Sequence, residues 1–303
     1  MCSFSPTKNL NYHKNQAEIN CIDFDDDGDL ALTSAADESI QLYDMKQGKH
    51  RSTIYSKKYG VTLAKFTHNR MNCIYASTKE DGHKGRVHSL EVSPLEDLIL
   101  SGSDDNTVRL WDLRSPTCQG LLNTPAPSLV AFDPSAVLFC VASEKLNCLS
   151  LYDVRNFDKQ PFSVFKLDSN SRPWQKVEFS NNGKTVLVST SEDIHYLLDS
   201  FHGEIKAKLT GHSPIPRPSQ RNSGHTCFSQ DGRFVFSGSG DKRIYIWDTN
   251  KQPDHDLRLR HIKALNSPQP PALLAMNPKT MLLATANTEL TLWLPSLNRE
   301  KNK

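Results

Sequence analysis

A polar turn signal recurs seven times along this 303-residue chain, each time between two short apolar runs. The turns begin at Asp25, Thr67, Ser93, Asp133, Ser180, Ser229 and Asn277. All but one of the steps between successive turns lie near the period of roughly 40–45 residues that a four-stranded propeller blade requires. The exception is the step from Thr67 to Ser93, which is little more than half as long. Short strands at such regular spacing restrict the chain to an all-β architecture.

The third apolar run of each unit ends in a similar way, and this ending selects one architecture. Most runs close on a large apolar residue followed by aspartate, as in Tyr43-Asp44, Trp111-Asp112, Tyr152-Asp153, Leu198-Asp199 and Trp247-Asp248. The combination of this Trp-Asp ending with the blade-length period is typical of a WD40 β-propeller. We therefore predict an all-β, seven-bladed WD40 β-propeller over residues 19–294.

The two ends of the chain are predicted to form a closing strand and a tail. The last unit, which ends at Trp293-Leu294, supplies only three strands. We expect the N-terminal segment, residues 1–18, to add the fourth strand and to close the last blade, which leaves no exposed sheet edge there. Residues 295–303 form a charged C-terminal tail.

The second unit is too short for a blade. The next turn, at Ser93, follows its turn at Thr67 too closely for a complete blade. The sequence between Ala76 and Gly82-His83 contains no third or fourth strand. The sequence therefore predicts a truncated second blade, whose missing strands would leave the edges and apolar faces of its neighbours uncovered. Two explanations remain open: a coding segment lost by splicing or by a gene-model error, or a functional isoform with an open or distorted ring.

The third unit carries the clearest version of the repeat. It contains Gly82-His83, Ser101, Asp105 and Trp111-Asp112, which resembles the WD40 signature almost residue for residue. In that family a His, a Ser or Thr, an Asp and a Trp form a hydrogen-bonded set inside the blade. The resemblance implies that the corresponding set in this chain is His83, Ser101, Asp105 and Trp111. A buried indole N–H and a buried imidazole both require such partners. The sixth unit keeps Ser237, Asp241 and Trp247, whereas Gly224-His225 lies too close to the strand to serve as its Gly-His pair.

Composition and charge exclude several classes of protein. The 36 basic and 34 acidic residues leave a net charge of +2, which argues against a protein that coats nucleic acid electrostatically. No apolar run approaches the length of a membrane span, and Met1 to Gln16 lacks the apolar core of a secretory signal. Seven scattered cysteines without a Cys-x-x-Cys pair indicate free thiols in a reducing compartment, either nucleus or cytosol.

The sequence contains no recognisable catalytic constellation. It has no phosphate-binding loop, no Gly-x-Ser-x-Gly elbow and no His-Glu-x-x-His pair. Gly238-Ser239-Gly240 is interpreted as a turn, Asp25-Asp26-Asp27 as a solvated hairpin turn rather than a cation site, and His225-x-Cys227 as strand packing rather than a pair of metal ligands. We expect no catalytic residue, no metal and no cofactor.

Propellers bind partners through the loops of one face. The first connection between blades contains Lys57, Lys58 and Tyr59, two cations beside an aromatic ring that could meet an acidic or phosphorylated peptide. The alternative is a solvated loop with Tyr59 packed on the rim. The connection from Gly211 to Gly224, rich in Pro, Ser and Arg, is either a second binding loop or an insertion.

Several strings together resemble one particular WD-repeat family. They are found at residues 56–60, 109–121, 132–134, 151–162, 179–184, 277–279 and 293–295. In this order, and over nearly the whole chain, they resemble the WD-repeat subunit of the COMPASS histone methyltransferase that is shared with the cleavage and polyadenylation machinery. The departure is the second unit, where the family has a complete blade.

This resemblance implies a nuclear, non-catalytic scaffold, monomeric within a hetero-complex. The implied partners are the N-terminal region of the methyltransferase that acts on lysine four of histone H3, a phosphatase regulatory subunit of the polyadenylation factor, and the phosphorylated tail of RNA polymerase II. It implies no sequence-specific nucleic acid and no membrane. Two other classes stay open: a substrate receptor of a ubiquitin ligase, which needs an adaptor segment outside the ring, and a propeller enzyme, which needs ionisable groups converging at the central channel.

Overall fold

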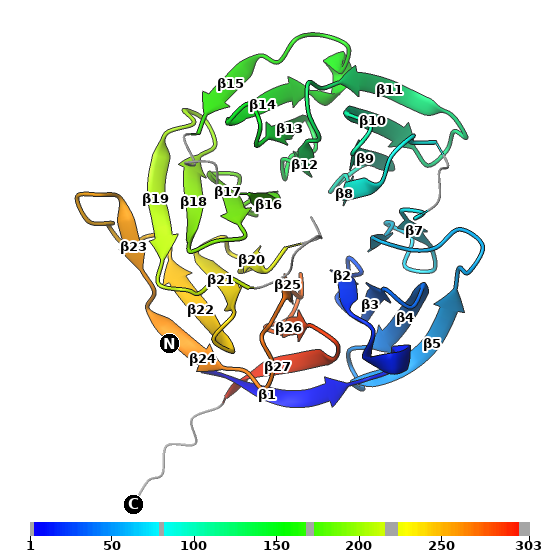
Figure 1. Ribbon diagram of the computed structural model, residues 1–303, viewed down its shortest axis with the longest axis vertical. Coiled ribbons are helices and arrows are strands. Elements are labelled where there is room, and N and C mark those ends of the chain that lie inside the picture. The colour runs from blue at the N-terminus through cyan, green and yellow to red at the C-terminus, as the bar shows by residue number, and fades with distance from the viewer. Residues whose placement is uncertain (1–2, 79–81, 168–172, 216–223, 297–303) are drawn as a thin grey trace, which may run out of the picture.

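A computed structural model describes residues 3–78, 82–167, 173–215 and 224–296. Within these ranges the sheets are arranged around a central axis, with β2, β8, β12, β16, β20 and β25 innermost (Figure 1). Helix is confined there to two short 3-10 turns, η1 (Lys14–Gln16) and η2 (Val154–Asn156). No helix of the described residues is long and apolar enough to cross a membrane.

The strands follow the chain around the ring, sheet by sheet. The first half of the ring contains β2 (Ile19–Phe24), β3 (Leu30–Ala35), β4 (Ser39–Asp44) and β5 (Lys49–Tyr55), then β6 (Ala64–Phe66) and β7 (Cys73–Tyr75), then β8 (Val87–Val92), β9 (Leu98–Ser103), β10 (Thr107–Asp112) and β11 (Cys118–Asn123), then β12 (Leu129–Phe132), β13 (Leu138–Ser143), β14 (Cys148–Asp153) and β15 (Ser163–Lys166).

The second half continues with three more sheets. It contains β16 (Trp174–Phe179), β17 (Thr185–Thr190), β18 (Ile194–Asp199) and β19 (Ile205–Thr210), then β20 (Thr226–Phe228), β21 (Phe234–Ser239), β22 (Arg243–Asp248) and β24 (Lys263–Asn266), then β25 (Leu273–Met276), β26 (Leu283–Ala286) and β27 (Leu290–Ser296). The short β23 (Arg258–Arg260) leaves its own unit and pairs in parallel with β19, so that sheet has five strands.

All seven predicted turns join antiparallel neighbours. They connect β2 to β3, β6 to β7, β8 to β9, β12 to β13, β16 to β17, β20 to β21 and β25 to β26. Glycine at positive φ serves three of these turns, at Gly28, Gly183 and Gly232, because an L side chain rarely adopts that backbone conformation. The local turn chemistry therefore fixes the positions of the inner hairpins.

The predicted count of seven blades is wrong. Among the described residues six sheets have four or five strands, whereas the second sector contains only the two-stranded hairpin β6–β7. The physical reason is length: the segment between Ala76 and Gly82 is too short for two further strands of about five residues each. The structure is thus a six-bladed propeller with a hairpin between the β2–β5 and β8–β11 blades (Figure 1).

The last blade is closed by the N-terminal strand, as the sequence predicts. β1 (Ser3–Leu10) pairs antiparallel with β27, from Ser3 opposite Ser296 to Leu10 opposite Leu290. Phe4 and Leu10 of β1 are buried, Phe4 beside Phe236 of the β20–β24 blade and Leu10 in the cluster that joins β25–β27 to the β2–β5 blade. β27 itself continues to Ser296, and residues 297–303 of the predicted tail lie outside the described residues.

The core is divided among the interfaces between neighbouring sheets. One cluster lies between the β12–β15 and β16–β19 sheets, around Trp174, and another joins β2–β5 to β25–β27 around Tyr43. Two smaller clusters flank the hairpin: Val61, Ala64 and Phe66 pack on the β2–β5 blade, while Leu63 and Ala76 meet Leu90 and Ile99 of the β8–β11 blade. The hairpin therefore contributes apolar contacts to both of its neighbours.

Candidate functional site

The four residues predicted as a hydrogen-bonded set lie together inside the β8–β11 blade. The His83 Nδ1 atom is 2.9 Å from a carboxylate oxygen of Asp105, and Nε2 is 2.7 Å from the Ser101 hydroxyl. The Trp111 indole N–H donates to the same hydroxyl at 2.8 Å. Ser101 can therefore accept from Trp111 while it donates to His83, which places the imidazole proton on Nδ1, toward Asp105.

Electrostatics keep this set in one protonation state at neutral pH. Burial lowers the pKa of His83, although Asp105 opposes the shift, so the imidazole is neutral. Burial would raise the pKa of Asp105, but hydrogen bonds from Thr107, His83 and the backbone N–H of Lys84 outweigh it and hold that pKa well below its usual range. The set is a fixed structural network with no group ready to exchange a proton near pH 7.

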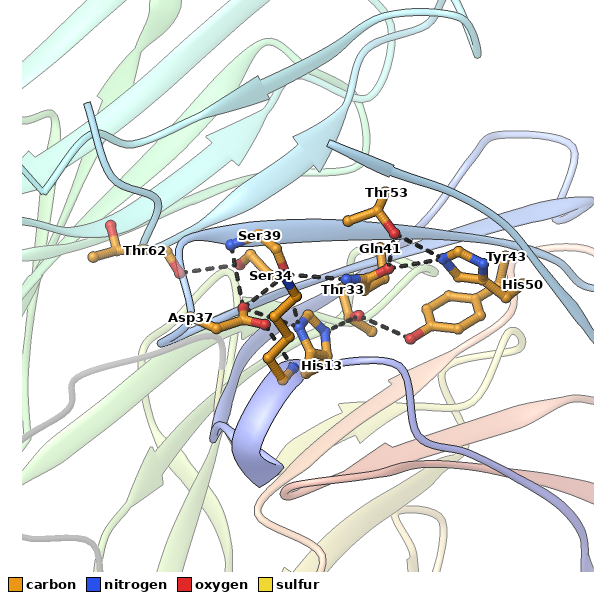
Figure 2. A network of polar contacts seen from close by, with 11 residues as sticks. His13, Thr33, Ser34, Asp37, Ser39, Gln41, Tyr43, His50, Thr53 and Thr62 are labelled. Atoms are coloured by element: carbon orange, nitrogen blue, oxygen red, sulfur yellow. Dashed lines mark hydrogen bonds and ion pairs between the residues drawn. The ribbon is translucent and has the colours of Figure 1, made fainter. Parts of the chain in front are cut away.

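The first blade contains an equivalent set that the sequence analysis missed. His13 Nε2 is 2.8 Å from the Thr33 hydroxyl, Nδ1 is 3.2 Å from a carboxylate oxygen of Asp37, and Thr33 donates to the Tyr43 hydroxyl at 3.5 Å. Figure 2 shows His13, from the segment before β2, pointing into the β3–β4 hairpin toward these side chains. The spacing of Thr33, Asp37 and Tyr43 equals that of Ser101, Asp105 and Trp111 and was the available signal.

The sixth unit is built differently. Ser237 is hydrogen-bonded to His195 of the neighbouring blade at 2.9 Å, the Trp247 N–H donates to the Thr210 carbonyl, and Asp241 accepts from Tyr245. The Gly-His pair of this unit is Gly211-His212: the His212 ring lies 5.8 Å from the Trp247 ring, centroid to centroid. Sequence reasoning missed it because the insertion before Gly224 stretches the usual spacing.

Stacked histidines between two blades predict an acid-sensitive fold. The rings of His195 and His212 lie 4.0 Å apart, and burial lowers the pKa of His212 to about 4 and that of His195 well below 6.5. In the unfolded chain these histidines bind protons at their ordinary pKa, whereas in the folded chain they do so only at lower pH. Their contribution to the free energy of unfolding is therefore complete above about pH 6.5 and is lost as the pH falls toward 4.

We expect the free energy of unfolding to drop by about 2 kcal/mol between neutral pH and pH 5 through His212 alone. Urea unfolding at the two pH values measures the change. His212→Gln retains a donor for the Glu192 carbonyl, which His212 Nε2 contacts at 2.8 Å, but cannot titrate. This variant should show a flatter pH dependence, and an unchanged slope would contradict the assignment.

An ionic cluster lines the central channel and anchors the hairpin. The Lys65 Nζ of β6 is 3.4 Å from Asp23 on β2 and 3.6 Å from Glu91 on β8. A carboxylate oxygen of Asp23 also accepts the Phe66 backbone N–H at 2.7 Å. Although burial opposes it, the carboxylates of Glu91 and Asp23 raise the pKa of Lys65, so the amine stays charged. One β6 side chain thereby bridges the blades on both sides of the hairpin.

The predicted partner-binding residues lie between β5 and β6. Lys57, Lys58 and Tyr59 are exposed, and the Lys58 amine lies 4.8 Å from the centre of the Tyr59 ring. The Tyr59 carbonyl accepts hydrogen bonds from the Thr78 N–H and the Ser77 hydroxyl, which fixes this loop against the end of the hairpin. Residues 216–223 of the second candidate loop lie outside the described residues.

The aspartates of the first turn and Cys227 make contacts within the fold. The Asp25 carboxylate accepts the Leu30 N–H inside the β2–β3 turn, and Asp26 pairs with His68 of the hairpin turn at 2.8 Å. Burial raises the pKa of the Cys227 thiol well above its usual range, so it is not a thiolate. Within the described ranges no three His, Cys, Asp or Glu side chains are grouped so that they could hold a metal ion.

Repeated antiparallel blades, closure by the N-terminal strand and the His–Ser/Thr–Asp–Trp/Tyr sets define a WD40 β-propeller. The family model described as "WD domain, G-beta repeat" matches residues 4–44, 72–112 and 203–248. WD repeat-containing protein 82 of Drosophila melanogaster is 38% identical over 94% of this chain and 93% of its own length.

Two fungal proteins are similar over most of the chain as well. The Set1 complex component swd2 of Schizosaccharomyces pombe is 36% identical over 82% of this chain and 75% of its own length. The COMPASS component SWD2 of Saccharomyces cerevisiae is 33% identical over 94% of this chain and 92% of its own length. The chain belongs to the WD-repeat family that contains these proteins.

Proposed function

We propose that this protein is a non-catalytic scaffold subunit of a nuclear histone H3 lysine-four methyltransferase complex of the COMPASS type. The observation that carries the proposal is the likeness to the Set1 and COMPASS components, at 36% and 33% identity over most of the chain. The site chemistry supports a binding role, because the histidine and aspartate of the repeat signature form a buried structural network held in one protonation state.

Affinity purification of the tagged full-length chain from its own nuclei, with mass spectrometry of the recovered proteins, tests this proposal. Methyltransferase subunits are the expected result. Recovery of phosphatase and polyadenylation subunits alone would instead place the chain in pre-mRNA 3′-end processing, and both sets would mean a shared module. Recovery of ubiquitin-ligase adaptors, or of chaperones alone, would contradict the proposal.

The loop of Lys57, Lys58 and Tyr59 is our proposed contact with these partners. Both lysines are exposed on one connection beside an exposed aromatic ring. The double substitution Lys57→Glu with Lys58→Glu is expected to reduce capture of the complex by about tenfold, because like charges across an interface are repelled. The melting temperature should stay within about 2 °C, since exposed charges contribute little to stability.

A matched control makes this prediction specific. Lys251→Glu with Lys279→Glu changes two other exposed lysines and gives the same net charge. Quantitative mass spectrometry of both purifications compares the recoveries. Equal capture by the two double variants would remove the loop from the interface.

A further inference from the structure

The hairpin in the second sector ends in a strand with only one neighbour. β7 pairs with β6, and the order of strands in this sheet contains no further member among the described residues. In the other six sheets the strand at this position is followed by a third and a fourth strand. A bare edge of this kind is a template for pairing with another extended chain.

The register shows which backbone groups face that edge. Leu63 accepts from the N–H of Ala76, and the Thr67 N–H donates to Asn72, so the residue pairs 63–76 and 67–72 are hydrogen-bonded pairs. In an antiparallel ladder these alternate with non-bonded pairs, which here are Ala64 with Tyr75 and Phe66 with Cys73. The backbone N–H and C=O groups of Cys73 and Tyr75 consequently point away from β6, to the open side.

The open side borders a recess of about 300 Å³. Tyr59, Tyr75, Ala76 and Ser77 line it on the hairpin side, and Val87, Leu90 and Trp111 are among the residues lining it on the β8–β11 side. Trp111 is only partly buried, whereas its counterparts in complete blades, Trp247 and Trp293, are 0% and 1% exposed. This difference is consistent with the second sector, where the described residues form only the strands β6 and β7 beside the β8–β11 blade.

The rim of the recess is basic. Lys57, Lys58 and Lys84 are exposed beside it. The Arg109 guanidinium lies 5.8 Å from the Trp111 ring, and its Nε atom is buried without a hydrogen-bond partner. Among the described residues on this side, Asp104 lies 3.3 Å from His88 and Asp105 lies 2.9 Å from His83. An entering segment therefore meets apolar and aromatic walls, with the cations of Lys84 and Arg109 beside them.

We propose that an extended segment of a partner protein, with alternating apolar and acidic side chains, binds in this recess as an added β-strand along β7. Its backbone pairs with Cys73 and Tyr75, its apolar side chains cover Trp111 and Leu90, and its carboxylates face Lys84 and Arg109. A second copy of this chain fits less well, because its own bare edge, β7, is Cys73-Ile74-Tyr75 and carries no carboxylate to face the cations of the recess. The proposal names the kind of partner segment and rests on the proposed scaffold function.

The probe is a phage-displayed library of random dodecapeptides, selected on the immobilised full-length chain. Peptides with Val, Ile, Phe or Tyr alternating with Asp or Glu are expected to be enriched. Binding of the enriched peptide, labelled with fluorescein, is then measured by fluorescence anisotropy. A library that yields no such peptide, or only basic ones, overturns the proposal.

Tyr75→Pro tests the pairing mode. It removes the N–H that faces the open side, while the ladder to β6 does not use that group. We expect binding of the enriched peptide to weaken by about tenfold or more, from one lost hydrogen bond and the steric hindrance of the proline ring. Tyr75→Val removes the same aromatic ring but keeps the N–H, and it should bind within about threefold of the unmodified chain.

Hydrogen exchange on the unmodified chain keeps the test independent of how the proline variant folds. The amides of Cys73 and Tyr75 should exchange faster than that of Ile74 in the free protein and become protected when the enriched peptide is added. Equal peptide affinity for Tyr75→Pro and Tyr75→Val, or no added protection at β7, overturns the proposal. So does a concentration-dependent dimer that Tyr75→Pro abolishes, because the occupant is then a second copy.

The two proposals fail separately. Methyltransferase subunits recovered with a chain that shows no strand addition would leave the scaffold function intact and overturn this inference. Strand addition by a chain that recovers no methyltransferase subunit would support the inference and overturn the scaffold assignment.

Discussion

Removal of residues 1–10 is expected to abolish the cooperative fold. β1 supplies the outer strand of the last blade, with seven residue pairs to β27 from Ser3–Ser296 to Leu10–Leu290. Burial of Phe4 and Leu10 contributes about 2 kcal/mol each, and the deletion also uncovers the edge of β27 beside the buried Trp293. The summed loss, on the order of 5 kcal/mol or more, approaches the whole stability of an ordinary domain.

The measurement is thermal unfolding of the shortened chain, followed by circular dichroism. We expect a melting transition that is lost or moved far below that of the full chain. A synthetic peptide of residues 1–12 added in trans should restore part of the transition, whereas the same peptide with Phe4→Ala should not. A shortened chain that melts like the full one would mean that β1 does not close the ring.

Substitution of Lys65 is expected to have the next largest effect. Lys65→Met removes the amine that lies between Asp23 and Glu91, and both carboxylates are partly buried. Lys176 still interacts with Glu91, so Asp23 loses the most. Removal of one partner of a buried ionic cluster costs about 3 kcal/mol or more. The unfolding free energy from urea titration should drop by that amount, and the hairpin should open before the blades.

A rescue variant separates charge from packing. The triple variant Lys65→Met, Asp23→Asn, Glu91→Gln removes all three charges, and the asparagine can still accept the Phe66 N–H. We expect it to be more stable than Lys65→Met alone, because the isolated carboxylates are gone. A single variant within about 0.5 kcal/mol of the unmodified chain, or a triple variant weaker than the single, would rule out the ionic anchor.

The hairpin turns and the hydrogen-bonded set of His83 could be predicted from the sequence. The seven polar turns all proved to be hairpins, because turn residues act over a few positions of chain. The His83 set was also readable, since its four members stand in the usual order and spacing. The His13 set was missed because no glycine precedes this histidine and Thr33 and Tyr43 replace serine and tryptophan.

Contacts between segments far apart in the sequence could not be predicted in this way. The parallel pairing of β23 with β19 joins residues of different units, and no turn chemistry marks it. The Lys65 cluster depends on β2, β6 and β8 meeting at the channel, which becomes apparent only once the strands are placed around the axis. The seven-blade count failed because the unit with the turn of the hairpin β6–β7 was counted as a blade. The short spacing after that turn correctly predicted that its third and fourth strands are missing, and the described residues there form only two strands.

The two-stranded hairpin β6–β7 packs against both neighbouring blades and is a folded part of the ring. Native-state hydrogen exchange of the full-length chain, followed by mass spectrometry, measures this. The Lys65 and Ile74 amides that face each other across β6–β7 should be protected, and they should exchange together with the innermost strands β2 and β8. Exchange of this hairpin within seconds, while the six blades stay protected, would show that the ring is open at the second sector.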